Sequence, residues 1–357
     1  MGLSGGVGVC EWLWKGSGRT TRQPSNQATK QPLALAMNKS YFCGPTTVNV
    51  YNSIDNFPGT GNAVVTIGTF DGVHIGHQMI IRNLRKIAAE THGQTVVLTF
   101  FPHPRMVLQP DDNDLKLLTT IPEREELLRS FGIDHLIVQP FDKEFSRLSA
   151  VEFVRDQLVN KIGMKTLVIG YDHHFGRNRE GSYKDLEEMA PVYGFRLEEI
   201  PGQMINELTV SSTKVRNFLL SGDVDAANRL LNHRYSIRGK VVEGDKLGRT
   251  IGFPTANIEV GEAYKLIPAE GVYAVNASVE GTMYDGMMYI GNRPVVGGKT
   301  LRIEVNLFDF NADIYGKEMQ IFFVARVRGD MNFPDLNALK AKLEEDQRTS
   351  MMILGRN

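Results

Sequence analysis

The sequence predicts an α/β domain built on a parallel sheet, followed by a smaller antiparallel β-barrel. Up to about Leu231, apolar β-branched runs alternate with segments of helical period, which is typical of a parallel sheet with helices on both faces. After Leu231, β-rich runs follow one another and glycine-bearing turns separate them, which is typical of a compact barrel. The 357 residues are enough for two domains, each with its own hydrophobic core.

We expect the first domain at residues 48–232 and the second at residues 233–357. In the first domain, strands are expected at residues 63–67, 95–101, 135–138, 166–170 and 195–200. Its helices are expected at residues 78–91, 123–131, 150–161, 186–193, 213–221 and 224–231. In the second domain, the β-rich runs are residues 235–258, 271–279, 287–290, 301–307 and 319–327, and a charged amphipathic helix at 335–346 closes the chain.

The composition excludes several classes of protein. The net charge is −1, with 42% hydrophobic and 23% charged residues, so no nucleic-acid or anionic-membrane partner is expected. No stretch approaches the roughly 18 consecutive apolar residues of a membrane span. The two cysteines, Cys10 and Cys43, form neither a disulfide framework nor a metal-ligand spacing, which favours a reducing cytoplasm. These features leave the oligomeric state open.

Residues 1–47 are rich in Gly, Ser, Thr and Gln, and we expect a disordered extension there that is unrelated to the fold. The segment lacks the roughly 7–15-residue apolar core of a secretion signal. Translation from Met37 is one explanation for the extension, and its basic, acid-poor character also permits a transit peptide.

A glycine-rich turn follows the first strand and leads into a helix that carries two histidines. Strand, turn and helix start form an arrangement in which backbone N–H groups and the helix dipole face an anion. His74 and His77 are three residues apart, so a helical start places both on one side, where they can donate hydrogen bonds to a phosphate as charge builds on it. The alternative is two surface histidines at a helix start. The candidate phosphate-binding residues of this loop are Gly68, Phe70, Asp71 and Gly76.

A second candidate phosphate segment precedes the helix at residues 213–221. Ser211, Ser212 and Thr213 stand at the helix start, and Lys214 and Arg216 follow closely. Such a run is a good N-cap, but a cap and a phosphate cradle use the same N–H groups, and two cations favour the phosphate site. His103, among prolines after the second strand, has either a structural role or the role of orienting a flat ring.

The barrel carries its own polar motif. Gly248 and Gly252 leave the backbone free to approach phosphates. Thr255 and Asn257 alternate on one strand face, where a hydroxyl and an amide oxygen can be presented to Mg²⁺. Glu304 lies in an alternating strand, on the face opposite its apolar neighbours. An exposed strand carboxylate is the ordinary explanation for such a residue.

These motifs carry a family resemblance that covers about residues 48–346. Gly68–His77 resembles the HxGH signature of the nucleotidylyltransferase superfamily, in the wording of the adenylyltransferase half of bacterial bifunctional riboflavin kinase/FAD synthetase. Residues 211–216 resemble the SSTxxR motif of that family, which embraces the ATP phosphates, and residues 248–257 resemble its kinase signature GRTxGFPTAN. The resemblance implies a Rossmann-like nucleotidylyltransferase domain followed by a riboflavin kinase barrel.

Three further assignments follow from the same resemblance. Residues 170–181 resemble the family's GxDFxFGxxxxG loop, which implies flavin contacts for Asp172 and Arg177, although His173 departs from the expected aromatic residue. Residues 326–333 resemble a segment that closes over the flavin, which implies a contact for Arg328. The strand of Glu304 resembles one whose glutamate takes the proton of the riboflavin 5′-hydroxyl. A zinc cluster at Asp172–His174 is disfavoured because adjacent residues cannot easily share one ion.

The implied function is a bifunctional enzyme with riboflavin, FMN and ATP as substrates and Mg²⁺ as the accompanying ion. The barrel transfers the γ-phosphoryl group of ATP to riboflavin, and the first domain adenylylates FMN to FAD and releases pyrophosphate. His74, His77 and Glu304 are the expected catalytic residues. FMN is already ionised, so its attack needs no protein base, whereas an alcohol benefits from one. A chain with one degenerate half, or a flavin-binding sensor or carrier, are the alternatives.

Overall fold

The computed structural model describes residues 47–109, 115–170, 174–200, 210–244, 247–295 and 298–356. These residues belong to one compact unit of the chain. The expected extension, including Cys10 and Cys43, lies outside the described residues apart from Thr47. Among the described residues, no helix is both long and apolar enough to cross a membrane.

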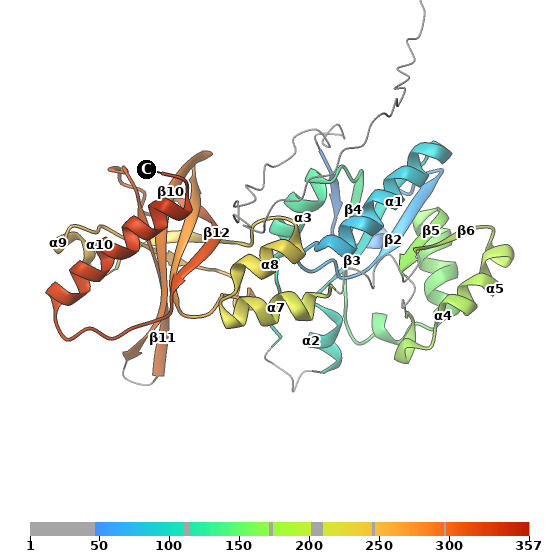
Figure 1. Cartoon of the computed structure of the whole chain (residues 1–357). Coiled ribbons are helices and arrows are strands. Elements are labelled where there is room, and N and C mark those ends of the chain that lie inside the picture. The colour runs from blue at the N-terminus through green and yellow to red at the C-terminus, as the bar shows by residue number, and fades with distance from the viewer. Residues whose placement is uncertain are drawn as a thin grey trace, which may run out of the picture. The chain divides into compact units, whose positions relative to one another are not determined.

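The first half contains a parallel sheet in the order β1-β4-β3-β2-β5-β6 (Figure 1). Five of its strands were predicted from apolar runs. The sixth, β1, was missed because its three residues are largely exposed and too short to show a period. The strands are β1 (Asn49–Tyr51), β2 (Ala63–Ile67), β3 (Gln94–Phe101), β4 (His135–Pro140), β5 (Met164–Gly170) and β6 (Arg196–Ile200).

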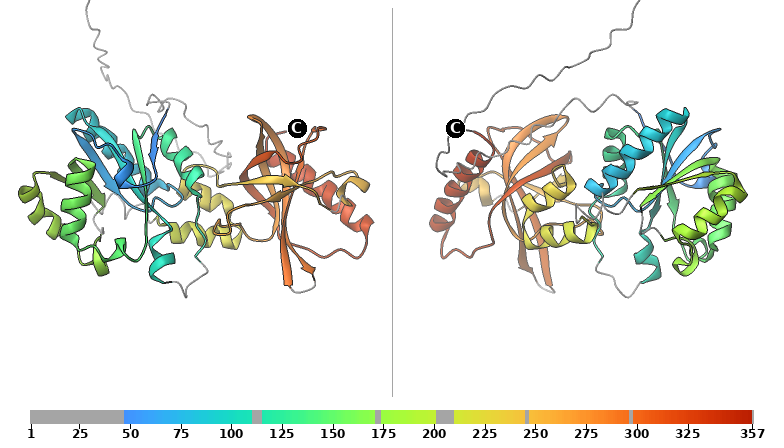
Figure 2. Two further views of the ribbon diagram at one scale, coloured as in Figure 1. Left: turned by 180° about the vertical axis from the view of Figure 1, so that it is seen from behind. Right: turned by 45° about the vertical axis from the view of Figure 1, so that its right-hand side comes forward.

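Helices cover both faces of this sheet (Figures 1 and 2). Alternate residues of β2 enter different cores: Val64 packs with Ile81 of the helix α1 (Ile75–Thr91), whereas Val65 packs with Leu158 of the helix η4 (Phe153–Ile162). The helices of this half are α1 (Ile75–Thr91), α2 (Pro104–Leu108), α3 (Ile121–Ser130), α4 (Ala150–Glu152), α5 (Tyr183–Tyr193), α7 (Ser212–Ser221) and α8 (Val224–Leu231). Shorter 3₁₀ turns are η2 (Ile54–Asn56), η3 (Phe145–Arg147) and η5 (Arg177–Arg179).

The helix expected over residues 150–161 differs in its backbone. It begins as α4 and continues as the wider π-helix η4 (Phe153–Ile162). Its apolar residues Phe153, Val154 and Leu158 are all buried against the sheet. Apolar spacing therefore predicted the element and its buried face, but not its hydrogen-bonding pattern.

The strand order predicts a ligand-binding crevice between β2 and β5, where the direction of the chain order reverses. Chain order runs outward from β2 to β3 and β4 on one side, and from β5 to β6 on the other. The loops that follow β2 and β5 therefore leave in opposite directions and open a crevice at the carboxyl ends of these strands. The histidine-bearing loop follows β2, as expected from the sequence.

The second half is a closed antiparallel barrel in the order β10-β11-β8-β7-β12-β9. The run expected over residues 235–258 was wrong in part, since it contains two strands with the short helix α9 between them. There the chain turns back, and the N–H groups of Ile251 and Phe253 donate to the carbonyl of Gly248. The elements are β7 (Ser236–Val242), α9 (Leu247–Thr250), β8 (Ala256–Glu259), β9 (Gly271–Val279), β10 (Thr282–Val295), β11 (Gly298–Leu307) and β12 (Glu318–Arg328).

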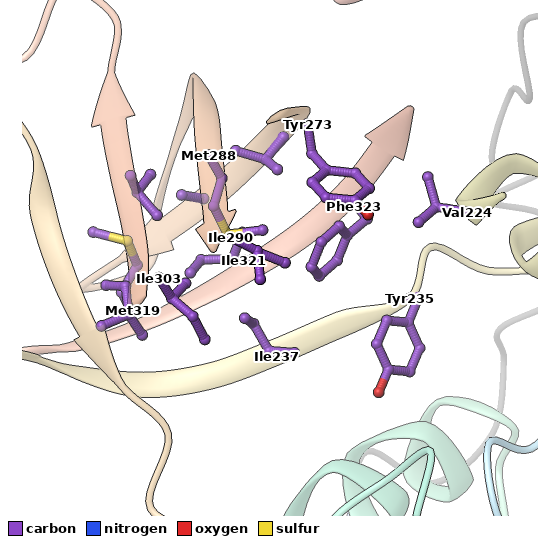
Figure 3. Close-up of a cluster of buried hydrophobic side chains, with 14 of the residues drawn as sticks. Val224, Tyr235, Ile237, Tyr273, Met288, Ile290, Ile303, Met319, Ile321 and Phe323 are labelled. Carbon is purple, nitrogen blue, oxygen red and sulfur yellow. The ribbon is translucent and has the colours of Figure 1, made fainter. Parts of the chain in front are cut away.

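The barrel interior is apolar, and two helices of the first half share it. Figure 3 shows Tyr235, Tyr273 and Phe323 together, with Val224 of α8 beside them. Leu219 of α7 belongs to the same buried cluster. The sequence assigned α7 and α8 to the first domain, whereas their apolar faces pack with the barrel core.

The final helix, α10 (Leu336–Ile353), is longer than the expected span of 335–346. Asp346, the expected last residue, is 1% exposed and pairs with Arg328 of β12 at 2.8 Å between Nη2 and Oδ2. Ser350 is also buried. These two polar residues therefore lie on the buried side of the helix.

Candidate active sites

The loop after β2 has a strained backbone. Phe70 and Val73 have φ angles of 47° and 41°, and Gly72 has 80°. Positive φ is rare for non-glycine residues and costs on the order of 1–3 kcal/mol at each. Phe70 and Val73 are also buried. Such a conformation persists only where the surroundings hold it.

Side chains from four parts of the chain hold this loop. The N–H of Gly72 donates to Oγ1 of Thr119 at 3.2 Å, and Nε2 of Gln78 donates to the carbonyl of Val73 at 2.9 Å. Oγ of Ser212 donates to the carbonyl of Asp71 at 2.9 Å. Nε2 of His233 lies 3.0 Å from the carbonyl of Gly72. The loop shape therefore depends on long-range contacts.

Asp71 is fully buried at the centre of these contacts. Its Oδ1 accepts the N–H groups of Leu118 and Thr119 at 2.9 and 3.0 Å. Its Oδ2 pairs with Nη2 of Arg216 at 2.5 Å, and Nη2 of Arg124 lies 3.9 Å from Oδ1. The sequence placed Asp71 among the phosphate-binding residues, and that assignment stays a prediction. The observed partners of its carboxylate belong to the protein itself.

His74 and His77 lie together at the start of α1, as the spacing predicted. Their rings stack with centroids 3.7 Å apart and planes inclined by 14°. The N–H of His77 donates to Nδ1 of His74 at 3.4 Å. A neutral imidazole has one donor and one acceptor, so neutral His74 carries its proton on Nε2. Nδ1 of His77 is buried and has no hydrogen-bond partner among the described residues.

Burial keeps both histidines neutral. It lowers the pKa of His74 from 6.5 to about 4, against the opposing effect of Asp71. Burial, with His74 as a further cause, lowers the pKa of His77 well below 6.5. Near neutral pH the pair therefore supplies hydrogen-bond donors rather than fixed positive charges. Gly76 lies between the His74 ring and Val210, and a Cβ at this position would be only 3.3 Å from each of them.

The start of α7 lies against the same loop. Oγ of Ser211 accepts the N–H of Lys214 at 3.2 Å and caps the helix. Ser212 and Arg216 bond to Asp71 as described, and Nε of Arg216 donates to the carbonyl of Lys116 at 2.8 Å. Thr213 is exposed. The structure thus joins the two candidate phosphate segments, and it confirms that the serine run is an N-cap.

A cavity of about 770 Å³ opens at the carboxyl ends of β2 and β3. Aromatic and arginine side chains line much of it, which suits a flat ring that bears a phosphate. His103 and Arg177, two of the three candidate flavin residues of this domain, are among the lining residues, and Asp172 lies outside the described residues. The cavity residues of most chemical interest are Gly68, Phe100, His103, Arg105, Phe145, Arg147, Phe175, Arg177 and Arg179.

His103 has a structural role as well. Its Nδ1 accepts the N–H of Arg105 at 3.1 Å and caps α2. Burial lowers its pKa to about 4, and the charges of Asp71 and Arg216 act on this pKa as they do on that of His74. His74 and His77 do not line the cavity. They belong to the same loop as Gly68 and Thr69, which line the cavity after the end of β2.

In the barrel, three predicted residues come together: Thr255 directly before β8, Asn257 in β8 and Glu304 in β11. Glu304 of β11 is paired with Asn257 of β8 in the sheet register. Oγ1 of Thr255 donates to Oε2 of Glu304 at 3.2 Å. A hydroxyl, an amide oxygen and a carboxylate form the hard oxygen donor set that suits Mg²⁺. Among the described residues, no group of three or more His, Cys, Asp or Glu side chains could hold a metal ion.

The predicted glycines shape the turn before Thr255. A Cβ at Gly248 would lie 2.2 Å from the carbonyl oxygen of Phe253, so the turn requires glycine there. Gly252 has φ of 87°, which favours glycine. A second cavity, of about 660 Å³, adjoins this turn and is lined by Thr255 together with Arg249, Phe310, Asp313 and Tyr315. Only Thr255 of these was named as a site residue from the sequence, although Arg249 lies in the same motif; Phe310, Asp313 and Tyr315 lie outside any motif.

Arg328 makes contacts within the protein. Its Nε lies 2.9 Å from Oδ2 of Asp346, and Nη1 donates to the carbonyl of Gly329 at 2.9 Å. The guanidinium also lies 5.6 Å from the ring centroid of Phe333. These contacts join β12 to α10, and the flavin contact stays a prediction.

One cavity lies beyond the parallel sheet and the other beside the glycine turn of the barrel, so each half of the chain has its own candidate site. Family models match the chain as FAD synthetase over residues 58–214 and as riboflavin kinase over residues 231–354. The chain belongs to the bifunctional riboflavin kinase/FMN adenylyltransferase family and combines both activities of flavin cofactor biosynthesis.

Several relatives bear the same description. The protein from Listeria monocytogenes is 38% identical over 87% of this chain and 96% of its own length. That from Haemophilus influenzae is 36% identical over 80% of this chain and 92% of its own length. A solved structure described as a macrolide-efflux protein from Streptococcus pneumoniae is 31% identical, with a TM-score of 0.76 over 85% of this chain and 98% of that one.

Proposed function

We propose that the two reactions divide at the junction of residues 232 and 233. The barrel phosphorylates riboflavin to FMN, and the α/β domain converts FMN to FAD with release of pyrophosphate. The observation that carries this division is the pair of separate motifs: stacked neutral histidines beside one cavity, and Thr255 bonded to Glu304 beside the other.

In the α/β domain, a phosphate oxygen of FMN attacks the α-phosphorus of ATP and pyrophosphate leaves. His74 and His77 donate hydrogen bonds to the oxygens on which negative charge develops. The proton on Nε2 of His74 and the unpartnered Nδ1 of His77 support this role. Arg216 and the N-terminus of α7 face the ATP phosphates, and the large cavity holds the flavin through His103 and Arg177. The flavin contact of Asp172 is proposed from the family resemblance alone.

In the barrel, Glu304 accepts the proton of the riboflavin 5′-hydroxyl as that oxygen attacks the γ-phosphorus, and ADP leaves. Its bond to Thr255 fixes the orientation of the carboxylate. Thr255 and Asn257 are the residues that would hold Mg²⁺, which supplies charge neutralisation of the triphosphate. The glycine turn at residues 248–252 lies where the phosphates approach the backbone.

Riboflavin, FMN and ATP are the small-molecule substrates that this chemistry requires. We also infer that the enzyme works in the cytoplasm, since the chain has only two cysteines, as suits a reducing compartment. Subcellular fractionation with an activity assay would test that placement; activity confined to a membrane or organelle fraction would overturn it.

Separation of flavins by chromatography tests the division of the reactions. Incubated with riboflavin, ATP and Mg²⁺, the His77→Ala variant should accumulate FMN and form no FAD. The Glu304→Gln variant should form no FMN from riboflavin, yet should make FAD when FMN is supplied. Loss of both products in folded His77→Ala, or loss of FAD synthesis from supplied FMN in folded Glu304→Gln, would contradict separate sites.

A further inference from the structure

Lys265, which belongs to the barrel half of the chain, is buried against a segment of the α/β half. It lies between β8 and β9, and its side chain is 1% exposed. Its Nζ donates to Oε2 of Glu123 at 2.6 Å and to the carbonyl of Leu118 at 2.7 Å. It also lies 4.6 Å from the ring centroid of Tyr235. A buried ammonium needs such partners, so its position is closely fixed.

Backbone hydrogen bonds extend this contact on both sides of Lys265. The N–H of Leu117 donates to the carbonyl of Tyr264 at 2.7 Å, and the N–H of Leu266 donates to the carbonyl of Leu117 at 2.8 Å. The hydroxyl of Tyr235 (Figure 3) donates to the carbonyl of Leu266 at 2.6 Å. Residues 264–266 therefore hold residues 117–118 as a short bridge between the halves.

The same segment holds the histidine-bearing loop from its other side. The N–H groups of Leu118 and Thr119 bind Asp71, and the carbonyl of Lys116 accepts Nε of Arg216. Residues 116–119 are thus bonded to Lys265 and its neighbours on one side and to Asp71 and Arg216 on the other. The established activity and the family comparisons assign no role to Lys265.

The ion pair of Glu123 with Lys265 makes the position of residues 116–119 depend on Lys265. Oε2 of Glu123 also accepts the N–H of Thr120 at 2.9 Å at the start of α3, and its Oε1 is buried with no partner among the described residues. Without Lys265, Glu123 would be a buried carboxylate with little compensation, and removal of one partner from such a pair is strongly destabilising locally. The segment directly before α3 is residues 116–119.

We propose that Lys265 is a positioning residue for FMN adenylylation, which the kinase barrel contributes to the other active site. It fixes residues 116–119, and these fix the Asp71–Arg216 pair beside His74 and His77. The inference rests on the proposed assignment of adenylylation to that loop. Lys265 acts through these residues and does not touch substrate.

The test compares Lys265→Met with Lys317→Met in the full-length protein. Lys317 is a matched barrel lysine, but its side chain is 38% exposed and pairs with Glu280 on the surface. Lys265→Met should lower the kcat/KM of adenylylation for ATP by about tenfold to a hundredfold, because small misplacements of positioning groups have effects of that size. Riboflavin phosphorylation by the same sample should change by less than about twofold, because the hydrogen-bond partners of Lys265 do not line the barrel cavity and distant sites act nearly independently.

A second comparison separates positioning from general destabilisation. The KM for ATP should rise while the KM for FMN stays unchanged, because other segments line the flavin cavity. Glu123→Gln added to Lys265→Met removes the unpaired charge and should restore most of the adenylylation.

The inference would be overturned if Lys265→Met adenylylated FMN with the kcat/KM of the wild type, or if it lost adenylylation and riboflavin phosphorylation to the same extent. A failure of the proposed function is distinguishable, because it would appear as FAD synthesis by His77→Ala.

Discussion

Substitution of Asp71 by asparagine should destabilise the protein far more than its small change in shape suggests. The carboxylate accepts two backbone N–H groups and the hydroxyl of Thr119, and it pairs with Arg216. Asparagine keeps one acceptor oxygen and turns the other into a donor, which faces donors in every orientation.

The magnitude follows from the burial of the cations. The side chain of Arg124 is 2% exposed and that of Arg216 is 12% exposed, so both would lose their counter-ion in a nearly dry environment. Removal of one partner from a buried ion pair costs about 3–5 kcal/mol. We expect a loss of this size in the free energy of unfolding of Asp71→Asn, together with loss of FAD synthesis.

Equilibrium urea denaturation of the full-length variant measures this free energy, and FAD synthesis is assayed well below the unfolding midpoint. Asp225→Asn is the matched control, because its carboxylate pairs with Arg229 on the surface and is 66% exposed. The control should change stability by less than about 1 kcal/mol. Equal effects of the two substitutions, or normal FAD synthesis by Asp71→Asn, would refute the reasoning.

Three further predictions concern pH, the loop and the barrel. His74 has a pKa of about 4 when folded and 6.5 when unfolded, so the unfolded chain binds more protons between these values, and this residue should lower stability by about 3 kcal/mol as pH falls from 6.5 to 4. Because His77 and His103 also have lowered pKa values, the test compares slopes: urea midpoints with the same pH slope in His74→Gln as in the wild type would argue against this contribution. Gly72→Ala should lower stability more than Gly194→Ala. Both glycines have positive φ, but only at Gly72 would the added methyl carbon meet a neighbour, 2.7 Å from Cδ1 of Leu118. Equal losses of stability measured by calorimetry would count against this packing. Thr255→Val should raise the Mg²⁺ requirement of FMN formation by about tenfold to a hundredfold without changing FAD synthesis from FMN, and an unchanged Mg²⁺ titration would remove Thr255 from the metal site.

The parts of the site that are local in sequence could be predicted from it. His74 and His77 are three residues apart at a strand–turn–helix junction, and the stacked pair lies where that pattern places it. Thr255 and Glu304 were found from alternation along the chain, and the pairing of β8 with β11 brings their side chains to 3.2 Å. The two-part architecture could also be predicted, because hydrophobic periodicity and turn residues are read from residues that are close together in the sequence.

Contacts made by backbone groups had no sequence signal. The partners of Asp71 are amides 47 and 48 residues away, and any residue type supplies an amide. Lys265 reads as an ordinary surface cation but is 3% exposed as a whole residue. Its burial follows only from the packing of residues 264–266 on residues 117–118.

Burial against an unexpected neighbour explains the remaining differences. The apolar faces of α7 and α8 were predicted, but periodicity does not say which core they join, and they pack with the barrel. The last helix was expected to end at Asp346, whereas it continues to Ile353, and both Asp346 and Ser350 are buried in it. His103 was left between a structural and a ligand role, and its cap of α2 and its place in the cavity wall support both.

The most direct test of two separate active sites follows the phosphorus atoms of ATP. Given riboflavin and ATP labelled at either the α- or the γ-phosphorus, His77→Ala should transfer only the γ-label to flavin. Glu304→Gln, given FMN, should transfer only the α-label. Transfer of both labels by one variant, or of neither label by both variants while they remain folded, would contradict the account.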